Sequence, residues 1–82
     1  MNTPTMHPVK SSQILSIGHD PSENILFVTF IHGGATYMYQ NVEEKQFNEL
    51  LESKSVGKLF SSTIKGQAKH PFKKLEAKEV AR

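Results

Sequence analysis

Two tyrosines, Tyr37 and Tyr39, stand two positions apart in a short segment that follows the glycine pair Gly33-Gly34. Residues i and i+2 of an extended strand lie on the same face, so both rings are predicted to project from one side of a sheet. Aromatic rings placed in this way can stack on the unpaired bases of a single-stranded nucleic acid. They could equally cover a core beneath helices, with their hydroxyls at its rim.

Lysines gather in the second half of the chain, and no acidic residue occurs between Ser53 and Leu75. Ammonium groups could neutralise phosphates, which would make binding weaken with added salt. Ser55 and Lys58 stand at the predicted start of a helix, where free backbone N–H groups favour an anion. The alternative is a solvated lysine face that keeps a small domain in solution. The lysines are Lys54, Lys58, Lys65, Lys69, Lys73 and Lys74.

Catalysis and metal binding find little support in the pattern. The chain has no cysteine, and its four histidines show no metal-ligand spacing. Ser11-Ser12 lies near His19 and Asp20, but no nucleophile elbow surrounds these serines. Hydroxyls at residues 61–63 could reach a phosphate, although such groups more commonly bond to the preceding helical turn. We therefore predict no catalytic residue, no metal site and no cofactor.

Three strands must position the tyrosines. Alternation of apolar residues predicts a first strand from about Gln13 to His19, with Ile14 and Ile17 on opposite faces. A second strand over residues 25–31 is apolar on both faces, which is typical of a central strand. A two-residue hairpin loop at the glycine pair then leads into the tyrosine strand, because glycine adopts positive φ without a steric penalty.

Two helices are predicted to follow. Asn41 is a suitable N-cap, Glu44 completes a pattern like a capping box, and the helix should end near Glu52. In the second helix, Gly57 suggests a close approach of another segment, and Gly66 ends the helix. Its apolar residues recur with helical spacing at Val56, Leu59, Phe60, Thr63 and Ile64.

With 82 residues, the chain fits one domain. We predict an α+β fold, in which a three-stranded antiparallel meander is followed by two packed helices and a basic C-terminal tail. Residues 1–10 should form a flexible arm, 11–66 the domain, and 67–82 a basic tail that is partly docked or mobile. The net charge of +2, the lack of cysteine and the lack of a signal-peptide pattern favour the cytoplasm, with no membrane contact.

A series of short motifs, taken in order, resembles the KTSC domain. This domain is named for its occurrence at the C-terminus of some lysyl-tRNA synthetases, and it also occurs alone in small bacterial and phage proteins. The resemblance covers roughly residues 9–72 and implies a small α+β domain with an RNA-binding role. The chain departs from the family pattern at His19, which follows the Ile-Gly pair, and where His70 and Phe72 stand instead of a tyrosine. The motifs are Ser11-Ser12, Ile17-Gly18, Leu26-x-Val28-x-Phe30, Gly33-Gly34, Tyr37-x-Tyr39, Val42 and Ser55-x-Gly57-Lys58-x-Phe60-x-x-x-Ile64-Lys65.

We therefore expect a small non-enzymatic module that binds nucleic acid, RNA before DNA, through a basic helix beside an aromatic strand. The alternative is a protein-interaction module, either a homodimer or a phage-encoded binder of a host protein. It would use the apolar second face of the strand over residues 25–31, since an uncovered patch of this kind marks an interface. The predicted nucleic-acid-binding residues are Tyr37, Tyr39, Lys54, Ser55, Lys58, Ser62, Lys65 and Lys69.

Overall fold

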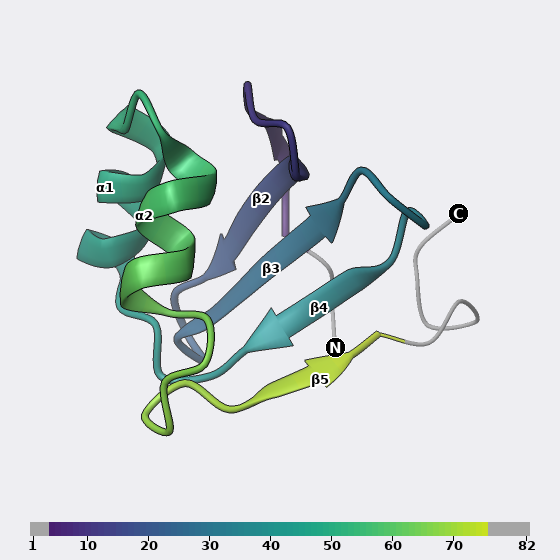
Figure 1. The fold of residues 1–82 in the computed structure, drawn as a ribbon. Coiled ribbons are helices and arrows are strands. Elements are labelled where there is room, and N and C mark those ends of the chain that lie inside the picture. Colours follow the sequence, from purple (N-terminus) through teal and green to yellow (C-terminus); the bar gives the residue numbers. More distant parts are fainter. Residues whose placement is uncertain (1–3, 76–82) are drawn as a thin grey trace.

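The computed structural model describes residues 4–75 and shows one antiparallel sheet with two helices packed on one of its faces (Figure 1). The order of the strands in the sheet follows their order in the chain. The elements are β1 (His7–Pro8), β2 (Ile14–Asp20), β3 (Ile25–Phe30), β4 (Thr36–Tyr39), α1 (Glu44–Glu52), α2 (Val56–Thr63) and β5 (Phe72–Lys74).

The α+β class, the antiparallel meander and the two helices after it are confirmed, but the predicted number of strands is wrong. Strand β1 pairs with β2, so part of the predicted flexible arm belongs to the sheet. Strand β5 pairs with β4, with Phe72 opposite Tyr39, so part of the predicted tail does too. Two and three residues are too few to show an alternation, which explains why both strands were missed. Residues 76–82 of the predicted tail lie outside the described residues.

A β-bulge changes which side chains of β2 share a face. Ile14 pairs with Phe30 and Ser16 pairs with Thr29, so Leu15 is an extra residue on β2. An extra residue reverses the alternation beyond it. Ile14 and Ile17 consequently both enter the core beneath the helices, and the prediction that they lie on opposite faces is wrong.

The loop between β3 and β4 is longer than predicted. The Phe30 N–H donates to the Ala35 carbonyl at 3.0 Å, which leaves four residues in the loop. Gly33 and Gly34 do adopt positive φ, at 83° and 65°. The expected use of the glycines is thus confirmed, whereas the expected two-residue loop is wrong.

The first helix begins two residues later than predicted, because its N-cap is not Asn41. Glu43 is the N-cap, and its N–H donates to Oε1 of Gln46 at 3.2 Å in a capping box. Asn41 instead has a φ of 61°, which asparagine tolerates better than most residues. Its side-chain amide donates to the Lys69 carbonyl at 3.0 Å, and so ties the segment before β5 to the end of β4.

Apolar side chains are buried on both faces of the sheet. The larger core lies under the helices, and a smaller one lies on the opposite face, where Phe27 is 1% exposed beside Met6 and Leu75. Gly18 permits this cover, because a Cβ atom there would lie 2.7 Å from Met6 Sδ. The expectation of an open second face is therefore wrong, and the alternative of a protein-interaction module loses the observation on which it rested.

Candidate nucleic-acid interface

Five aromatic rings form a closed circuit at the β4–β5 end of the sheet, which we call the aromatic cluster. Neighbouring ring centroids lie 5.0–6.0 Å apart, within the range of favourable aromatic pairs. Three elements of the sheet and one helix contribute to the circuit, so the tertiary fold positions it. In order around the circuit, its members are Phe30, Tyr37, Phe72, Tyr39 and Phe60.

The cluster is buried at its base and open at its rim. Phe60 and Tyr39 are 1% and 4% exposed, whereas Phe30 and Tyr37 are half-buried and Phe72 is 60% exposed. The two tyrosines therefore differ in role. Tyr39 belongs to the core, as the alternative of a tyrosine pair covering the core predicted, while Tyr37 lies at a surface that a ligand could reach.

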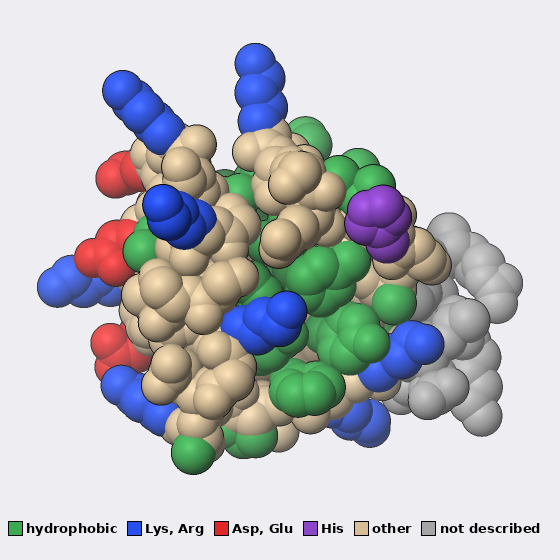
Figure 2. Space-filling view, in the orientation of Figure 1, with side chains coloured by type: hydrophobic (Ala, Val, Ile, Leu, Met, Phe, Trp, Pro, Cys, Tyr) green, Lys and Arg blue, Asp and Glu red, His purple; other side chains and the backbone are tan. Residues whose placement is uncertain are grey.

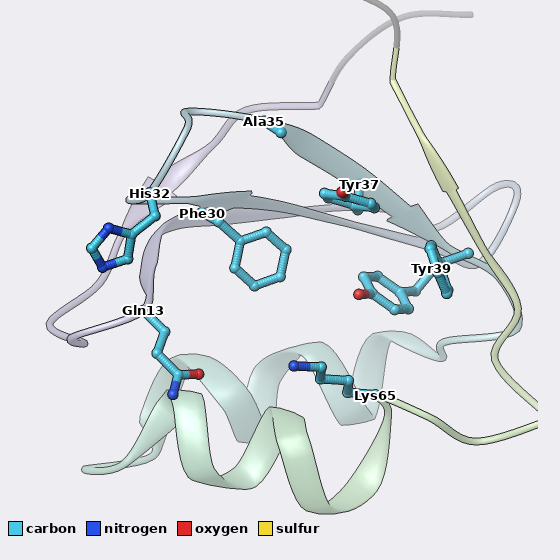
Figure 3. Close-up of a pocket in the computed structure, with 8 residues that line it drawn as sticks. Gln13, Phe30, His32, Ala35, Tyr37, Tyr39 and Lys65 are labelled. Carbon is cyan, nitrogen blue, oxygen red and sulfur yellow. The ribbon is translucent and has the colours of Figure 1, made fainter.

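The open side of the cluster is one wall of a depression of about 460 Å³, which we call the aromatic hollow. Figure 3 shows the rings of Phe30, Tyr37 and Tyr39 on the sheet side of the hollow and the Lys65 side chain on the opposite, helix side. The Gln13 side chain runs from the segment before β2 toward the helices at one end of the hollow. In the space-filling view, hydrophobic side chains gather on this surface with Lys or Arg side chains among and around them (Figure 2). The hollow thus combines stacking surfaces with hydrogen-bonding groups and a positive charge.

The surrounding structure fixes the protonation of Tyr39 and the backbone position of Lys65 in the hollow. Burial, and secondarily the neighbouring phenol of Tyr37, raises the pKa of Tyr39, so its hydroxyl keeps its proton at neutral pH. Lys65 directly follows the last turn of α2, where its N–H donates to the Phe60 carbonyl at 3.0 Å. This bond fixes the backbone from which the Lys65 side chain enters the hollow.

A second depression, of about 480 Å³, lies where the segment before β2 meets the start of α2; we call it the lysine–serine groove. A Cβ atom at Gly57 would lie 2.9 Å from Ser11 Oγ, which confirms the close approach predicted at this glycine. Ser11 Oγ in turn accepts hydrogen bonds from the N–H groups of Gln13 and Ile14. The groove is lined by Lys10, Ser11, Ser12, Gln13, Lys54, Ser55, Val56, Gly57, Lys58 and Ser61.

The structure divides the eight predicted binding residues into three groups. Three of them line the aromatic hollow: Tyr37, Tyr39 and Lys65. Three line the lysine–serine groove: Lys54, Ser55 and Lys58. Ser62 and Lys69 line neither depression; the Ser62 hydroxyl donates to the Leu59 carbonyl at 3.1 Å, as hydroxyls on helices commonly do.

Several lining residues were not among the predicted binding residues, and four of them bear on the site. Phe30 and Phe72 belong to the aromatic cluster, while Gln13 and Lys10 precede β2. The alternation of β3 placed Phe30 on the same face as Val28, so that signal was available. Gln13 carried none, because only the pairing of Ile14 with Phe30 brings its neighbourhood to the hollow.

Histidines hold the segments beside the cluster in place. His70 is buried, and its Nδ1 donates to the Gln40 carbonyl at 2.9 Å, while the Gln40 N–H donates to the Pro71 carbonyl. His19 stacks on Phe47 and bonds the Val42 carbonyl at 2.6 Å. Within residues 4–75, no three His, Asp or Glu side chains come close enough together to hold a metal ion. The helices of the same region are too short and too polar to cross a membrane.

A sequence model of the KTSC domain matches residues 10–67, most of the chain. The chain belongs to the KTSC domain family. A protein of Tsukamurella paurometabola is 43% identical over 60 residues, which cover 73% of this chain and 88% of that protein. An uncharacterised protein of Stutzerimonas stutzeri is 39% identical over 59 residues, which cover 72% and 82% of the two chains.

The fold is also similar to a solved structure. The crystal structure of a KTSC domain protein from Yersinia pestis superposes with a TM-score of 0.79 at 38% identity. The match covers 88% of this chain and 97% of the Yersinia chain. The similarity extends well past the three strands and two helices that the sequence predicted.

Proposed function

We propose that this KTSC domain is a non-enzymatic module that binds single-stranded RNA, with an unpaired base seated in the aromatic hollow. The observation that carries the proposal is the position of the Lys65 side chain across the hollow from three aromatic rings. Stacking of a base on an aromatic side chain contributes about 1–3 kcal/mol, and an ammonium group nearby attracts the phosphate of the same nucleotide.

The hollow is suited to a flat ligand because its floor is already rigid. Tyr39 lines the hollow, and its ring meets that of the buried Phe60 edge to face at 5.0 Å. Side chains held in this way lose little conformational freedom when a ligand binds. The protonated Tyr39 hydroxyl adds a hydrogen-bond donor at neutral pH.

The preference for RNA over DNA rests on what the resemblance implies, because the domain is named for its occurrence at the C-terminus of some lysyl-tRNA synthetases, which act on RNA. None of the relatives described above is itself described as a synthetase, so this support comes from the family alone. An RNA ligand would also agree with the expected cytoplasmic location.

The test is binding of a mixed-sequence, single-stranded RNA, followed by fluorescence anisotropy at low and moderate salt. Lys65→Ala should weaken binding several-fold and lower the slope of log K against log salt by about 1, because one phosphate contact is lost. Lys45→Ala is the matched control; Lys45 is an exposed lysine of α1 outside both depressions, and its removal should leave the slope unchanged. Absence of RNA binding by the unmodified protein at low salt would overturn the proposal.

A further inference from the structure

The two depressions share one residue. Gln13 lines both the aromatic hollow and the lysine–serine groove. We infer that they form one binding track, in which the Gln13 amide reads an adenine base seated in the hollow and the groove holds the phosphate of the adjacent nucleotide. This inference rests on the proposed function and specifies its ligand as an adenine-containing oligonucleotide of at least two nucleotides.

The backbone of Gln13 is fixed on both sides. Its N–H donates to Ser11 Oγ at 3.1 Å, and its carbonyl accepts from the Ile31 N–H at 2.9 Å. The side chain, by contrast, is exposed and lines the hollow, with its amide on the side of the hollow that faces the helices (Figure 3). A fixed backbone with a free amide is the arrangement that base recognition requires, since the amide starts from a defined position and still has hydrogen bonds to make.

The chemistry of the amide favours adenine. A glutamine amide presents one donor beside one acceptor, and this pair matches the N6 amino group of adenine together with a ring nitrogen. Adenine offers this combination on both its Watson–Crick and its Hoogsteen edge, so either orientation of the stacked ring satisfies the amide. Its purine ring also covers more of the aromatic wall than a pyrimidine does.

The groove supplies what the sugar–phosphate backbone needs. Lys10, Lys54 and Lys58 line it together with serine hydroxyls, and the described residues that line it include no acidic side chain. The positively charged path runs past Gln13, with these three lysines on one side of it and Lys65 on the other. A single nucleotide whose base fills the hollow leaves the groove empty, so a longer strand should bind more tightly.

The experiment compares oligo-adenylate, oligo-uridylate and adenosine monophosphate as ligands of the full chain. The unmodified protein should bind oligo-adenylate at least about five-fold more tightly than oligo-uridylate, and Gln13→Ala should reduce that preference to the part that stacking of the larger purine ring supplies. Gln67→Ala is the matched control, because Gln67 is exposed and lines neither depression. Lys54→Ala combined with Lys58→Ala should weaken binding of oligo-adenylate and leave adenosine monophosphate unaffected.

The possible outcomes distinguish failure of the inference about Gln13 from failure of the proposed RNA binding on which it rests. If both oligonucleotides bind equally and Gln13→Ala changes neither, the assignment to Gln13 is wrong while RNA binding stands. If adenosine monophosphate binds as tightly as oligo-adenylate, the single track is wrong. If no RNA binds at all, the proposed function itself falls. Thermal unfolding of Gln13→Ala should match that of the unmodified protein, because both hydrogen bonds of Gln13 use backbone groups.

Discussion

Aromatic side chains are buried to different extents on the two faces of the sheet. On the face opposite the helices, Phe27 is fully covered, with Met6 and Leu75 from the two ends of the described chain beside it. On the helix face, the core closes over β2 and β3, but Tyr37 stays half-buried and Phe72 is exposed. Side chains from near the two ends of the described chain therefore cover one face of the sheet, whereas aromatic rings on the other face remain accessible to solvent. We take this contrast as the physical argument for a ligand at the aromatic hollow.

The lengths of the helices explain the contrast. Helices α1 and α2 have only nine and eight residues, and α2 ends at Thr63. The chain then turns through Gly66, at a φ of 78°, and runs back to the sheet edge as β5. The rings at this end of the sheet therefore pack mainly on one another.

The largest expected effect is the difference in stability between two variants, each with one phenylalanine replaced by alanine, on opposite faces of the sheet. Phe27→Ala should lower the free energy of unfolding by about 3–5 kcal/mol, because it empties a fully buried site. Phe72→Ala should cost less than about 1 kcal/mol, because most of that ring is already in water. Urea denaturation of both variants measures the difference. Equal losses of stability would show that the hollow is as structural as the sealed face.

A second test disturbs the cover of the sealed face. Gly18→Ala would place a Cβ atom 2.8 Å from the Thr5 carbonyl oxygen, so the segment before β1 must move away. Overpacking of this kind costs about 1–3 kcal/mol. The segment should become sensitive to limited proteolysis, while RNA affinity stays unchanged. A change in affinity would contradict the separation of the two faces.

A third test loosens the rim of the open face. His70→Ala removes the hydrogen bond to the Gln40 carbonyl that holds the segment before β5. Stability should fall by more than about 1 kcal/mol, because the substitution removes one hydrogen bond and also the packing of a ring that is only 3% exposed. Amide hydrogen exchange should rise in β5 and leave β1 unchanged. Faster exchange in both strands would instead indicate that the two sheet edges open together.

The smallest effect is a change in the dependence of stability on pH. The folded protein raises the pKa of Tyr39 above its ordinary value of 10.0, chiefly through burial. The stability tied to its neutral phenol is complete below pH 10.0 and is lost as pH rises through the higher folded-state pKa. Tyr39→Phe should therefore lose less stability above pH 10.0 than the unmodified protein does, in thermal unfolding measured across that range. Parallel declines would contradict this.

Much of the fold was predictable from the sequence because its central elements are periodic. Residues 25–31 and the stripe from Val56 to Ile64 carry enough repeats to define a strand and a helix. The bulge at Leu15 and the two edge strands were not predictable, because pairing partners rather than local pattern define them. The capping residue was misassigned because asparagine is a preferred N-cap and glutamate is not. In the structure Glu43 caps the helix through a capping box with Gln46, and the Asn41 side chain instead donates to the Lys69 carbonyl.

The candidate site was predicted in its residue types but not in its arrangement. Tyr37, Tyr39 and Lys65 do line a single hollow. Lys54 and Lys58 do not reach it, because they lie at the other end of α2 and line a separate groove. The connection through Gln13 depends on the register of β2 against β3, which no local pattern encodes.

The edge strand β5 has a further consequence, for how the protein folds. Strands β1 to β4 each pair with a neighbour close in sequence, whereas β5 must meet β4 across both helices, with Phe72 opposite Tyr39. Closing this longer loop costs more chain entropy, so we expect β5 to dock late in folding and to detach early in unfolding. The part of the aromatic hollow that Phe72 forms would then open more often than the rest of the sheet. A ligand would enter the hollow when β5 detaches locally from β4.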